Sequence, residues 1–279
     1  MTPLRAWIVR IVLLGLGSAG LASAAVWLAS ERRLHATETW PQPVLDAVPA
    51  DEATVREGER LGRILGCPSC HGPAMAGAPV RDARTGLDLA APNLTRVRHA
   101  YTNDALARAI RAGVDRDGRA LYGMPARDFR HLSDEDVRRV IAWLRALPER
   151  ADALARRGPG VGARLRLLVG RAVPDALAVG PVTPSSSEPD AATRGRYLAH
   201  VACGECHGAT LEGDGARVPP LTVAVAYTEA AFAHLMRTGE TPGGRDLTVM
   251  DDTARARFTH FTDEEIASLY AYLRQRAGQ

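Results

Sequence analysis

Two copies of one pentapeptide, Cys-x-x-Cys-His, contain all four cysteines of this 279-residue chain. The first copy begins at Cys67 and the second at Cys203. Two thiols at this spacing can each form a thioether with a haem vinyl group, and the histidine that follows can bind the iron. The pattern therefore predicts two covalently attached haem c groups. The residues expected to hold them are Cys67, Cys70 and His71 in the first copy and Cys203, Cys206 and His207 in the second.

Other cysteine chemistries explain the doubled motif less well. Zinc binds Cys and His side chains in tetrahedral sites, but such a site does not need a histidine directly after the second cysteine in both copies. A thioredoxin-like dithiol would lie between a strand and a helix, and neither copy has that context. A disulfide framework would leave both histidines unexplained. Haem attachment is the chemistry that uses the whole motif.

The sequence around the two motifs is an internal repeat. Residues 111–124 align with residues 237–250 at one constant offset, so that Met124 falls on Met250. A thioether can reach the face of the iron opposite the histidine, and it favours the ferrous state. Each methionine lies in a loop rich in Gly, Asp and Arg that precedes a helix. We therefore predict Met124 and Met250 as the second ligands of the two irons.

Histidines are the alternative second ligands. His131 and His260 align with each other, each two residues before an expected helix. They rank below the methionines because their surroundings are typical of helix caps, where an imidazole usually bonds a nearby backbone group. Among the other methionines, Met75 lies too close to His71 to reach the opposite face of the iron, and Met236 fits the core side of a helix.

Helices are expected to surround each haem. Ser133 and Thr262 begin two equivalent helices with patterns that resemble a capping box, and apolar residues then recur at i, i+3, i+4 and i+7. Further helices are expected near residues 55–65, 103–112, 192–201 and 229–238. These segments predict an all-α fold.

The motifs and their order resemble the class I c-type cytochromes, and within them the multihaem cytochrome subunits that accept electrons from periplasmic dehydrogenases. The resemblance covers residues 53–147 and 191–275, and it is carried by the two Cys-x-x-Cys-His motifs with Met124 and Met250. It implies two tandem cytochrome c-like domains, each made of a few short helices around a covalent haem.

The resemblance also implies a role for two prolines. In this family a proline carbonyl often orients the haem-binding histidine, and the segments 92–95 and 219–222 match that element. One position departs from the family pattern, because Asp251 follows Met250 where Pro125 follows Met124.

The N-terminus is expected to be a membrane anchor. Nineteen uncharged residues run from Ile11 to Ala29. Trp7 and Trp27 stand about 30 Å apart along a helix, which is the thickness of the hydrocarbon core, and tryptophan favours both interfaces. The segment 22–24 is a possible cleavage signal, but the apolar run continues past it, and this favours an uncleaved anchor.

Composition and spacing together give the expected organisation of the chain. It comprises an anchor helix over residues 1–33, a linker over 34–52, a first cytochrome c domain over 53–150, a second linker over 151–190 and a second cytochrome c domain over 191–279. The prolines at 41 and 43 would stiffen the first linker. The second linker is basic, and it either packs across one domain as a connector or lies on anionic lipid or a partner subunit. Its arginines are Arg156, Arg157, Arg164, Arg166 and Arg171.

Charge and motif content exclude several classes of function. The formal net charge of +3 is small and dispersed, which disfavours nucleic-acid binding. The sequence has no Gly-x-Ser-x-Gly motif, and its carboxylates are scattered. An iron with both axial positions filled by His and Met offers no place for a substrate. The chain is therefore expected to carry electrons and not to be an enzyme.

The resemblance implies a place and partners. Bacteria attach haem to such motifs outside the cytoplasmic membrane, so the haem domains should face the periplasm from a single-pass anchor in the inner membrane. The expected role is a relay from a dehydrogenase or quinol-oxidising partner to an oxidase or a soluble cytochrome. Alternatives are a fixed dihaem subunit of a haem-copper oxidase, a dihaem peroxidase in which one iron opens for peroxide, and haem-based sensing.

Overall fold

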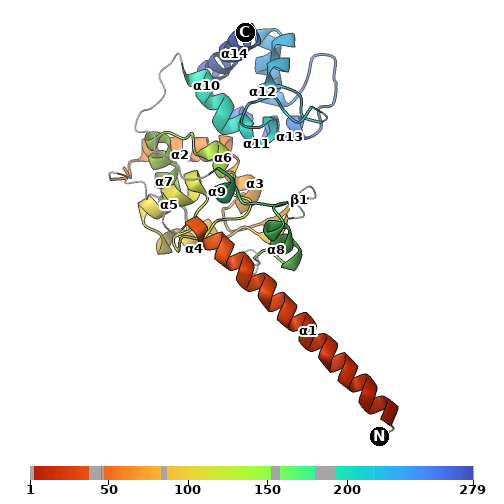
Figure 1. Ribbon diagram of the computed structural model, residues 1–279. Coiled ribbons are helices and arrows are strands. Elements are labelled where there is room, and N and C mark those ends of the chain that lie inside the picture. Colours follow the sequence, from red (N-terminus) through yellow and green to blue (C-terminus); the bar gives the residue numbers. More distant parts are fainter. Residues whose placement is uncertain are drawn as a thin grey trace.

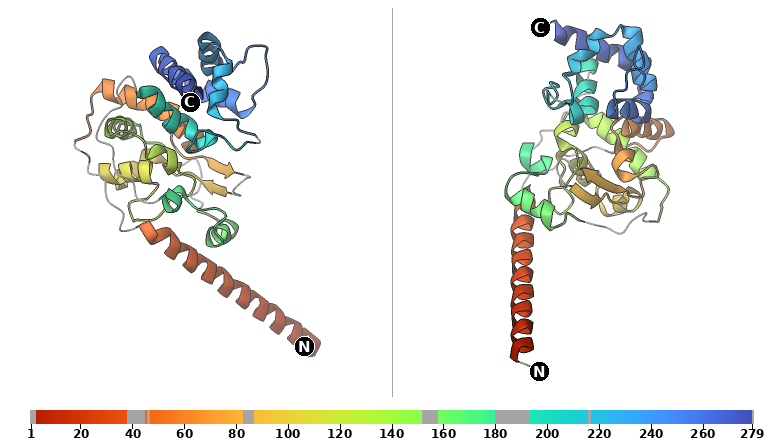
Figure 2. Two further views of the ribbon diagram at one scale, coloured as in Figure 1. Left: turned by 45° about the horizontal axis from the view of Figure 1, so that its top comes forward. Right: turned by 90° about the vertical axis from the view of Figure 1, so that its right-hand side faces the viewer.

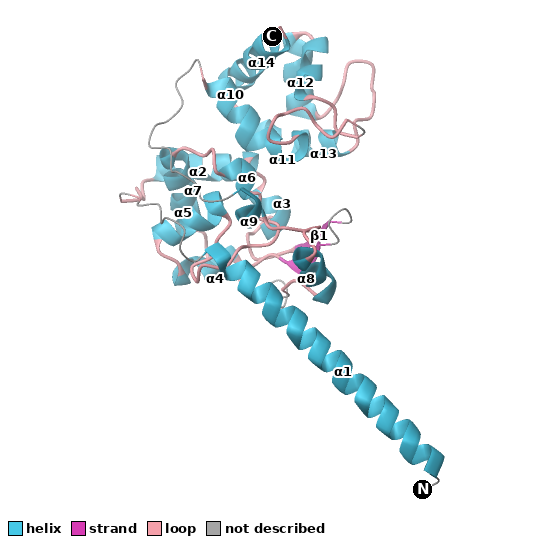
Figure 3. Cartoon of the chain, viewed as in Figure 1, coloured by secondary structure: helices cyan, strands magenta, loops and turns pink. Residues whose placement is uncertain are grey.

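The computed structural model describes residues 3–37, 45, 47–82, 87–151, 158–179, 193–215 and 217–278. A long N-terminal helix leads into a first helical domain, and a second helical domain packs on the side away from that helix (Figure 1). The predicted all-α fold is confirmed. One departure is a small antiparallel hairpin in the first domain, β1 (Pro79–Asp82) and β2 (Leu87–Ala90), which appears in magenta in Figure 3.

The first domain is built on a close crossing of two helices. Its helices are α2 (Glu52–Ile64), α3 (Cys67–His71), α4 (Leu94–Val97), α5 (Asn103–Ala112), α6 (Ala126–Phe129) and α7 (Asp134–Ala146). A Cβ atom on Gly58 of α2 would lie 1.8 Å from the carbonyl oxygen of Arg139 in α7. Glycine therefore lets the two helix backbones touch, and the apolar faces of α2, α5 and α7 close the core.

The second domain repeats this crossing. Its helices are α10 (Arg194–Leu198), α11 (Gly204–His207), α12 (Glu229–Thr238), α13 (Val249–Arg257) and α14 (Asp263–Ala277), with a π-helical segment, Ala199–Cys203, between α10 and α11. A Cβ atom on Gly195 of α10 would lie 2.0 Å from the carbonyl oxygen of Ser268 in α14. The same packing solution thus serves both halves of the repeat.

The two predicted helix starts are confirmed. The Ser133 hydroxyl accepts a hydrogen bond from the backbone N–H of Asp136 at 3.1 Å. Thr262 and Glu265 form a reciprocal capping box at the start of α14. Each cap satisfies backbone N–H groups that a helix leaves free at its first turn.

The described part of the second linker is folded. It forms α8 (Val161–Leu168) and α9 (Asp175–Val179), and these helices pack against the end of α1 and against the first domain. A small apolar core joins α1, the linker helices and the first domain. Its buried members are Leu34, Ala112, Val114, Ala120, Leu167 and Ala176. The connector interpretation therefore holds for these residues, while positions 41, 43, 156 and 157 lie outside the described residues.

Helix α1 (Pro3–Leu34) projects from the rest of the molecule (Figure 2). Its segment from Trp7 is long and apolar enough to cross a membrane, with a mean hydropathy of 2.0. Large apolar side chains along it, such as Leu14 and Leu21, are more than two-thirds exposed. A helix with exposed apolar side chains along its length is suited to a lipid environment.

Candidate haem sites

The first Cys-x-x-Cys-His motif forms one short helix, α3, whereas in the second motif the π-helical segment ends at Cys203 and α11 covers Gly204–His207. In the first domain Gly66, with φ 76°, precedes α3 and Gly72, with φ 78°, follows it. Positive φ values suit glycine, and these two bends separate the single turn from its neighbours. All four cysteines of the two motifs lie within the described residues, and none of them is in a disulfide.

The two histidines have identical hydrogen-bond partners. His71 Nδ1 lies 2.9 Å from the Pro92 carbonyl oxygen, and His207 Nδ1 lies 2.9 Å from that of Pro219. A carbonyl oxygen only accepts, so Nδ1 carries the proton in each ring and Nε2 keeps a lone pair for a metal. Burial lowers the pKa of both histidines, against the opposing effect of the hydrogen bond. The predicted proline contacts are therefore confirmed, and both imidazoles are held neutral.

The thiols lie in surroundings that disfavour charge. Burial raises the pKa of Cys67 and of Cys203 to about 12 in each case. The described residues contain no group of three or more His, Cys, Asp and Glu side chains arranged to hold a metal ion.

Both candidate methionines lie in the same domain as their histidine. Met124 packs against the core cluster that Cys67 also contacts, and Met250 packs against the cluster that contains Cys203. Met124 lies in the loop before α6, as expected, and its carbonyl oxygen accepts from Ala126 N at 2.8 Å. Met250 instead lies in the first turn of α13. Both side chains are partly buried, which suits a ligand between core and cofactor.

Two other methionines, Met75 and Met236, are core residues, as expected. Met75 and Met236 are each 1% exposed. Met75 packs in the core of the first domain and Met236 in the core of the second, so both side chains have a packing role.

The two aligned histidines lie between the domains. The exposed ring of His131 lies 5.3 Å from the ring of His200 in the second domain. The carbonyl oxygen of His260 accepts from Arg60 of the first domain at 3.0 Å. The hydrogen bonds that cap α7 and α14 come from Ser133 and Thr262, not from these imidazoles. This arrangement gives the histidines contacts between domains in place of the expected caps.

One arginine joins the two haem motifs. Arg257 of α13 is 8% exposed. Its Nε donates to the Ile64 carbonyl oxygen at 3.0 Å, just before the first motif, and its Nη1 donates to Glu205 inside the second motif at 2.9 Å. A Cβ atom on Gly66 would lie 2.6 Å from the guanidinium carbon. The Arg257 side chain therefore connects the two candidate sites.

A carboxyl group of the first domain lies against the second motif. Asp128 of α6 is 6% exposed and faces Gly204 of the second motif, where a Cβ atom would lie 2.3 Å from Asp128 Oδ1. Burial, with the nearby charges of Asp175 and Glu205, raises the pKa of Asp128 to about 7. Glycine at position 204 thus permits the domains to meet this closely.

Further polar contacts hold the domains together. Glu265 accepts from Arg60 at 2.7 Å and from Arg194 at 2.9 Å. The Tyr197 hydroxyl donates to Asp136 Oδ2 at 2.6 Å. These contacts could not be predicted, because most of them join residues far apart in the chain. Glu205, a charged residue inside a motif that is otherwise uncharged, was the signal for the Arg257 contact.

Comparison with known proteins identifies cytochrome sequences in both domains. Residues 53–144 match the family model described as cytochrome c oxidase, cbb3-type, subunit III. Residues 192–277 match the family model described as cytochrome c.

The chain is also similar to cytochrome subunits of bacterial dehydrogenases. It is 33% identical over 187 residues to the cytochrome c subunit of a quinone alcohol dehydrogenase of Gluconobacter oxydans (strain 621H), covering 61% of this chain and 37% of that protein. It is 26% identical over 297 residues to the fructose dehydrogenase cytochrome subunit of Gluconobacter japonicus, covering 91% and 58%. It is 30% identical over 182 residues to the gluconate 2-dehydrogenase cytochrome c subunit of Pantoea cypripedii, covering 57% and 38%. The alignments thus span less than two thirds of each relative.

Proposed function

We propose that this chain, which belongs to the c-type cytochromes, relays single electrons in a bacterial respiratory chain through two covalent haem c groups. The donor would be a dehydrogenase or a quinol-oxidising partner, and the acceptor an oxidase or a soluble cytochrome. The similarity to subunits of three dehydrogenases supports a dehydrogenase as donor. We place the two cytochrome c domains at residues 53–150 and 191–279.

The described side chains fit two haem groups. Cys67 and Cys70 would attach the first, with His71 and Met124 on its iron. Cys203 and Cys206 would attach the second, with His207 and Met250 on its iron. A haem bound in this way supplies a reversible one-electron change without an open position for substrate. The Pro92 and Pro219 carbonyl groups hold each imidazole in one tautomer and one orientation.

The observation that carries the relay is the contact between the two motifs. Arg257 hydrogen-bonds the segment before the first motif and Glu205 within the second, and Asp128 packs on Gly204 close by. Groups attached to these motifs would therefore be neighbours across the domain interface. A short separation is what transfer of an electron between two cofactors requires.

We further propose that α1 spans the inner membrane once and that both domains face the periplasm. The exposed apolar length of α1 supports the anchor. The side follows from where bacteria attach haem to this motif.

A second candidate is a fixed subunit of a haem-copper oxidase. The match of residues 53–144 to a model described as an oxidase subunit favours it. Purification of the native complex in mild detergent distinguishes the two, because the fixed subunit would copurify with oxidase subunits at constant stoichiometry.

The ligand assignment is tested by redox titration of the purified protein with visible and near-infrared spectra. Met124→Ala and Met250→Ala should each remove the thioether-to-iron absorption of one haem and lower the potential of that haem. Met236→Leu, which changes a core thioether, is the matched control and should leave both signals intact. Persistence of both signals in either alanine variant would refute that ligand, and a single haem in the unmodified protein would refute the relay.

A further inference from the structure

The end of α1 is fixed to the first domain and to α8 by charged groups. Glu31 accepts from Arg119 at 2.8 Å and from Arg164 of α8 at 2.6 Å. Arg164 also donates to the Ser30 hydroxyl at 2.7 Å, and Arg33 donates to the Leu168 carbonyl oxygen at 3.2 Å. These contacts hold α8 beside α1. Arg164 was one of the linker arginines for which contact with anionic lipid or a partner subunit was considered. In the structure its side chain instead binds Ser30 and Glu31 between α8 and α1.

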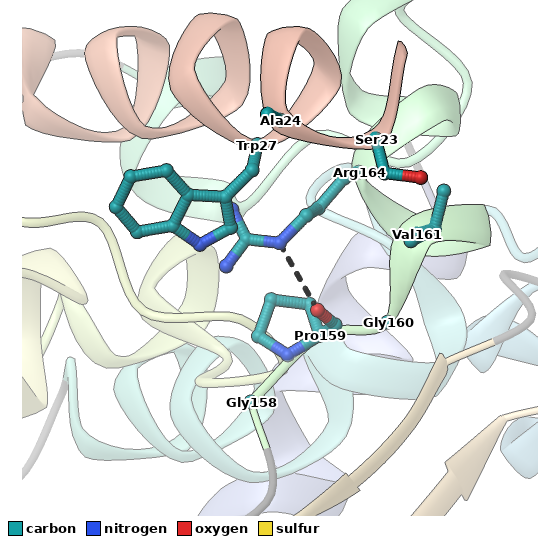
Figure 4. Close-up of a pocket in the computed structure, with 8 residues that line it drawn as sticks. All are labelled: Ser23, Ala24, Trp27, Gly158, Pro159, Gly160, Val161 and Arg164. Carbon is teal, nitrogen blue, oxygen red and sulfur yellow. Dashed lines mark hydrogen bonds between the residues drawn. The ribbon is translucent and has the colours of Figure 1, made fainter. Parts of the chain in front are cut away.

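The start of α8 reaches the level of Trp27 (Figure 4). Ser23, Ala24 and Trp27 of α1 line an open cavity of about 540 Å³ with residues 158–161 and Arg164. The Arg164 guanidinium lies 5.7 Å from the centre of the Trp27 ring, and its Nε donates to the Pro159 carbonyl oxygen at 3.2 Å. Trp27 is a residue type that favours the boundary of the hydrocarbon core. With α1 spanning a bilayer, the first turn of α8 would therefore lie at that boundary.

One face of α8 is apolar and exposed. Val161, Leu165 and Val169 are 50%, 45% and 67% exposed, and their spacing of four residues places them on one stripe. Ala163 and Leu167 are buried on the other side. We call Val161, Leu165 and Val169 the α8 stripe. Helix α8 itself lies beside α1 (Figure 1).

Basic residues accompany the stripe. Arg166 and Arg171 are exposed on and just after α8. An apolar face flanked by arginines matches a bilayer surface with anionic lipids, where the apolar groups enter the boundary and the guanidinium groups meet phosphates. At the level of Trp27 the neighbour of a membrane-spanning α1 is lipid, which favours a bilayer over a protein partner.

We propose that the α8 stripe is a second membrane contact, which enters the headgroup region of the bilayer beside α1. The proposal rests on the proposed anchoring by α1. Contact at two points would fix the tilt of the haem domains over the membrane, which a single helix leaves free.

The test measures thiol accessibility in the full-length holoprotein in nanodiscs of phosphatidylethanolamine and phosphatidylglycerol. Three single variants are compared: Leu165→Cys in the α8 stripe, Leu16→Cys within α1, and Ala230→Cys on the exposed side of α12. The unmodified protein is the blank, since its own cysteines would be in thioethers. The probe is a membrane-impermeant maleimide carrying polyethylene glycol, read as a gel shift.

Lipid excludes water and keeps a thiol protonated and slow to react. We expect Leu165→Cys and Leu16→Cys to react about tenfold more slowly than Ala230→Cys. If Leu165→Cys reacts as fast as Ala230→Cys while Leu16→Cys stays slow, the second contact is refuted and the anchor stands. If Leu16→Cys also reacts fast, both the anchor and the contact that depends on it are refuted.

Discussion

The loops that lead to the two candidate methionines come from one repeated sequence, but they have different surroundings. In the first domain Ala120 N donates to the Leu34 carbonyl oxygen at 2.8 Å, and the Thr37 hydroxyl donates to that of Gly118 at 2.5 Å. In the second domain residues 242–246 are exposed. The loop there is closed within itself by the Thr241 hydroxyl on the Arg245 carbonyl oxygen at 2.8 Å.

The same contrast applies to an ion pair next to each loop. Arg111 and Asp134 lie 2.5 Å apart with side chains 2% and 11% exposed, whereas the equivalent Arg237 and Asp263 are 33% and 97% exposed. The repeat therefore keeps the same residues in both copies, while the pair of the first copy is buried and that of the second is exposed. We expect the first site to be the more rigid and the second to lose its methionine more easily.

The largest expected difference comes from removing each arginine of this ion pair. Arg111→Gln should destabilise the first domain by about 3–5 kcal/mol, because it leaves Asp134 charged and buried without its partner. Arg237→Gln should have a smaller effect, because water screens the exposed pair and the other loss is of hydrogen bonds to the Thr259 and Phe261 carbonyl oxygens. Thermal unfolding followed at each haem band measures both. Equal losses of stability in the two variants would show that the different burial of the two ion pairs does not make them contribute differently.

A smaller effect is expected where the domains meet. Arg257→Gln removes a charged donor from the Ile64 carbonyl oxygen and from Glu205, at a cost of about 2 kcal/mol. It should also slow the exchange of electrons between the two haems in a half-reduced sample after flash photolysis. Arg255→Gln, on the exposed side of the same helix, is the matched control. An unchanged exchange rate in Arg257→Gln would show that this contact is not needed for electron transfer between the haems.

The interface should also respond to pH. The pKa of Asp128 is raised from 3.8 to about 7, mainly by burial, so the folded protein keeps a proton that the unfolded chain releases. This contribution to stability is complete below about pH 4 and is lost as pH rises towards 7. The facing charged groups are Asp175, Glu205, Arg127 and Arg257.

Between pH 4 and 8 the unmodified protein should lose a few kcal/mol at most of its free energy of unfolding through this group. Asp128→Asn should not show this loss. The measurement is the difference in melting temperature between the variant and the unmodified protein across that range. Asp117→Asn, an exposed carboxyl group in the same domain, serves as control. A difference that stays constant with pH would contradict the buried proton.

The smallest effect is expected from the threonines that close the methionine loops. Thr241→Val should cost about 1 kcal/mol and should lower the alkaline pH at which the second haem loses its thioether absorption. Thr37→Val should leave the second haem unchanged. If Thr241→Val changed the alkaline pH of thioether loss at the first haem alone, the proposed assignment of each loop to its haem would be wrong.

Local features of this molecule could be predicted from its sequence. The pentapeptides, the caps at Ser133 and Thr262 and the proline carbonyl groups each depend on residues close together or on an internal repeat. The caps and the proline contacts are confirmed. The methionine assignments stay predictions, because ligation depends on the cofactor.

Features that join distant segments could not be predicted. Arg257 meets Ile64 across almost two hundred positions, and no spacing rule links them. The fold of α8 depends on Leu167 entering a core that α1 and α9 complete, so its sequence in isolation resembled a linker. The hairpin β1–β2 escaped prediction because its strands are four residues each.

The contacts of Glu31 with Arg119 and Arg164 make a stiff junction between α1 and the first domain, and this affects how partners are found. A protein joined to its anchor by a stiff junction cannot tumble independently of α1, so with α1 and the α8 stripe both in a bilayer it would present its haem domains at a nearly constant height. Its encounters become lateral, between surfaces already turned toward one another, and much of the orientational search that slows free proteins is removed. Such a carrier selects partners by the height of their docking surface as well as by charge and shape.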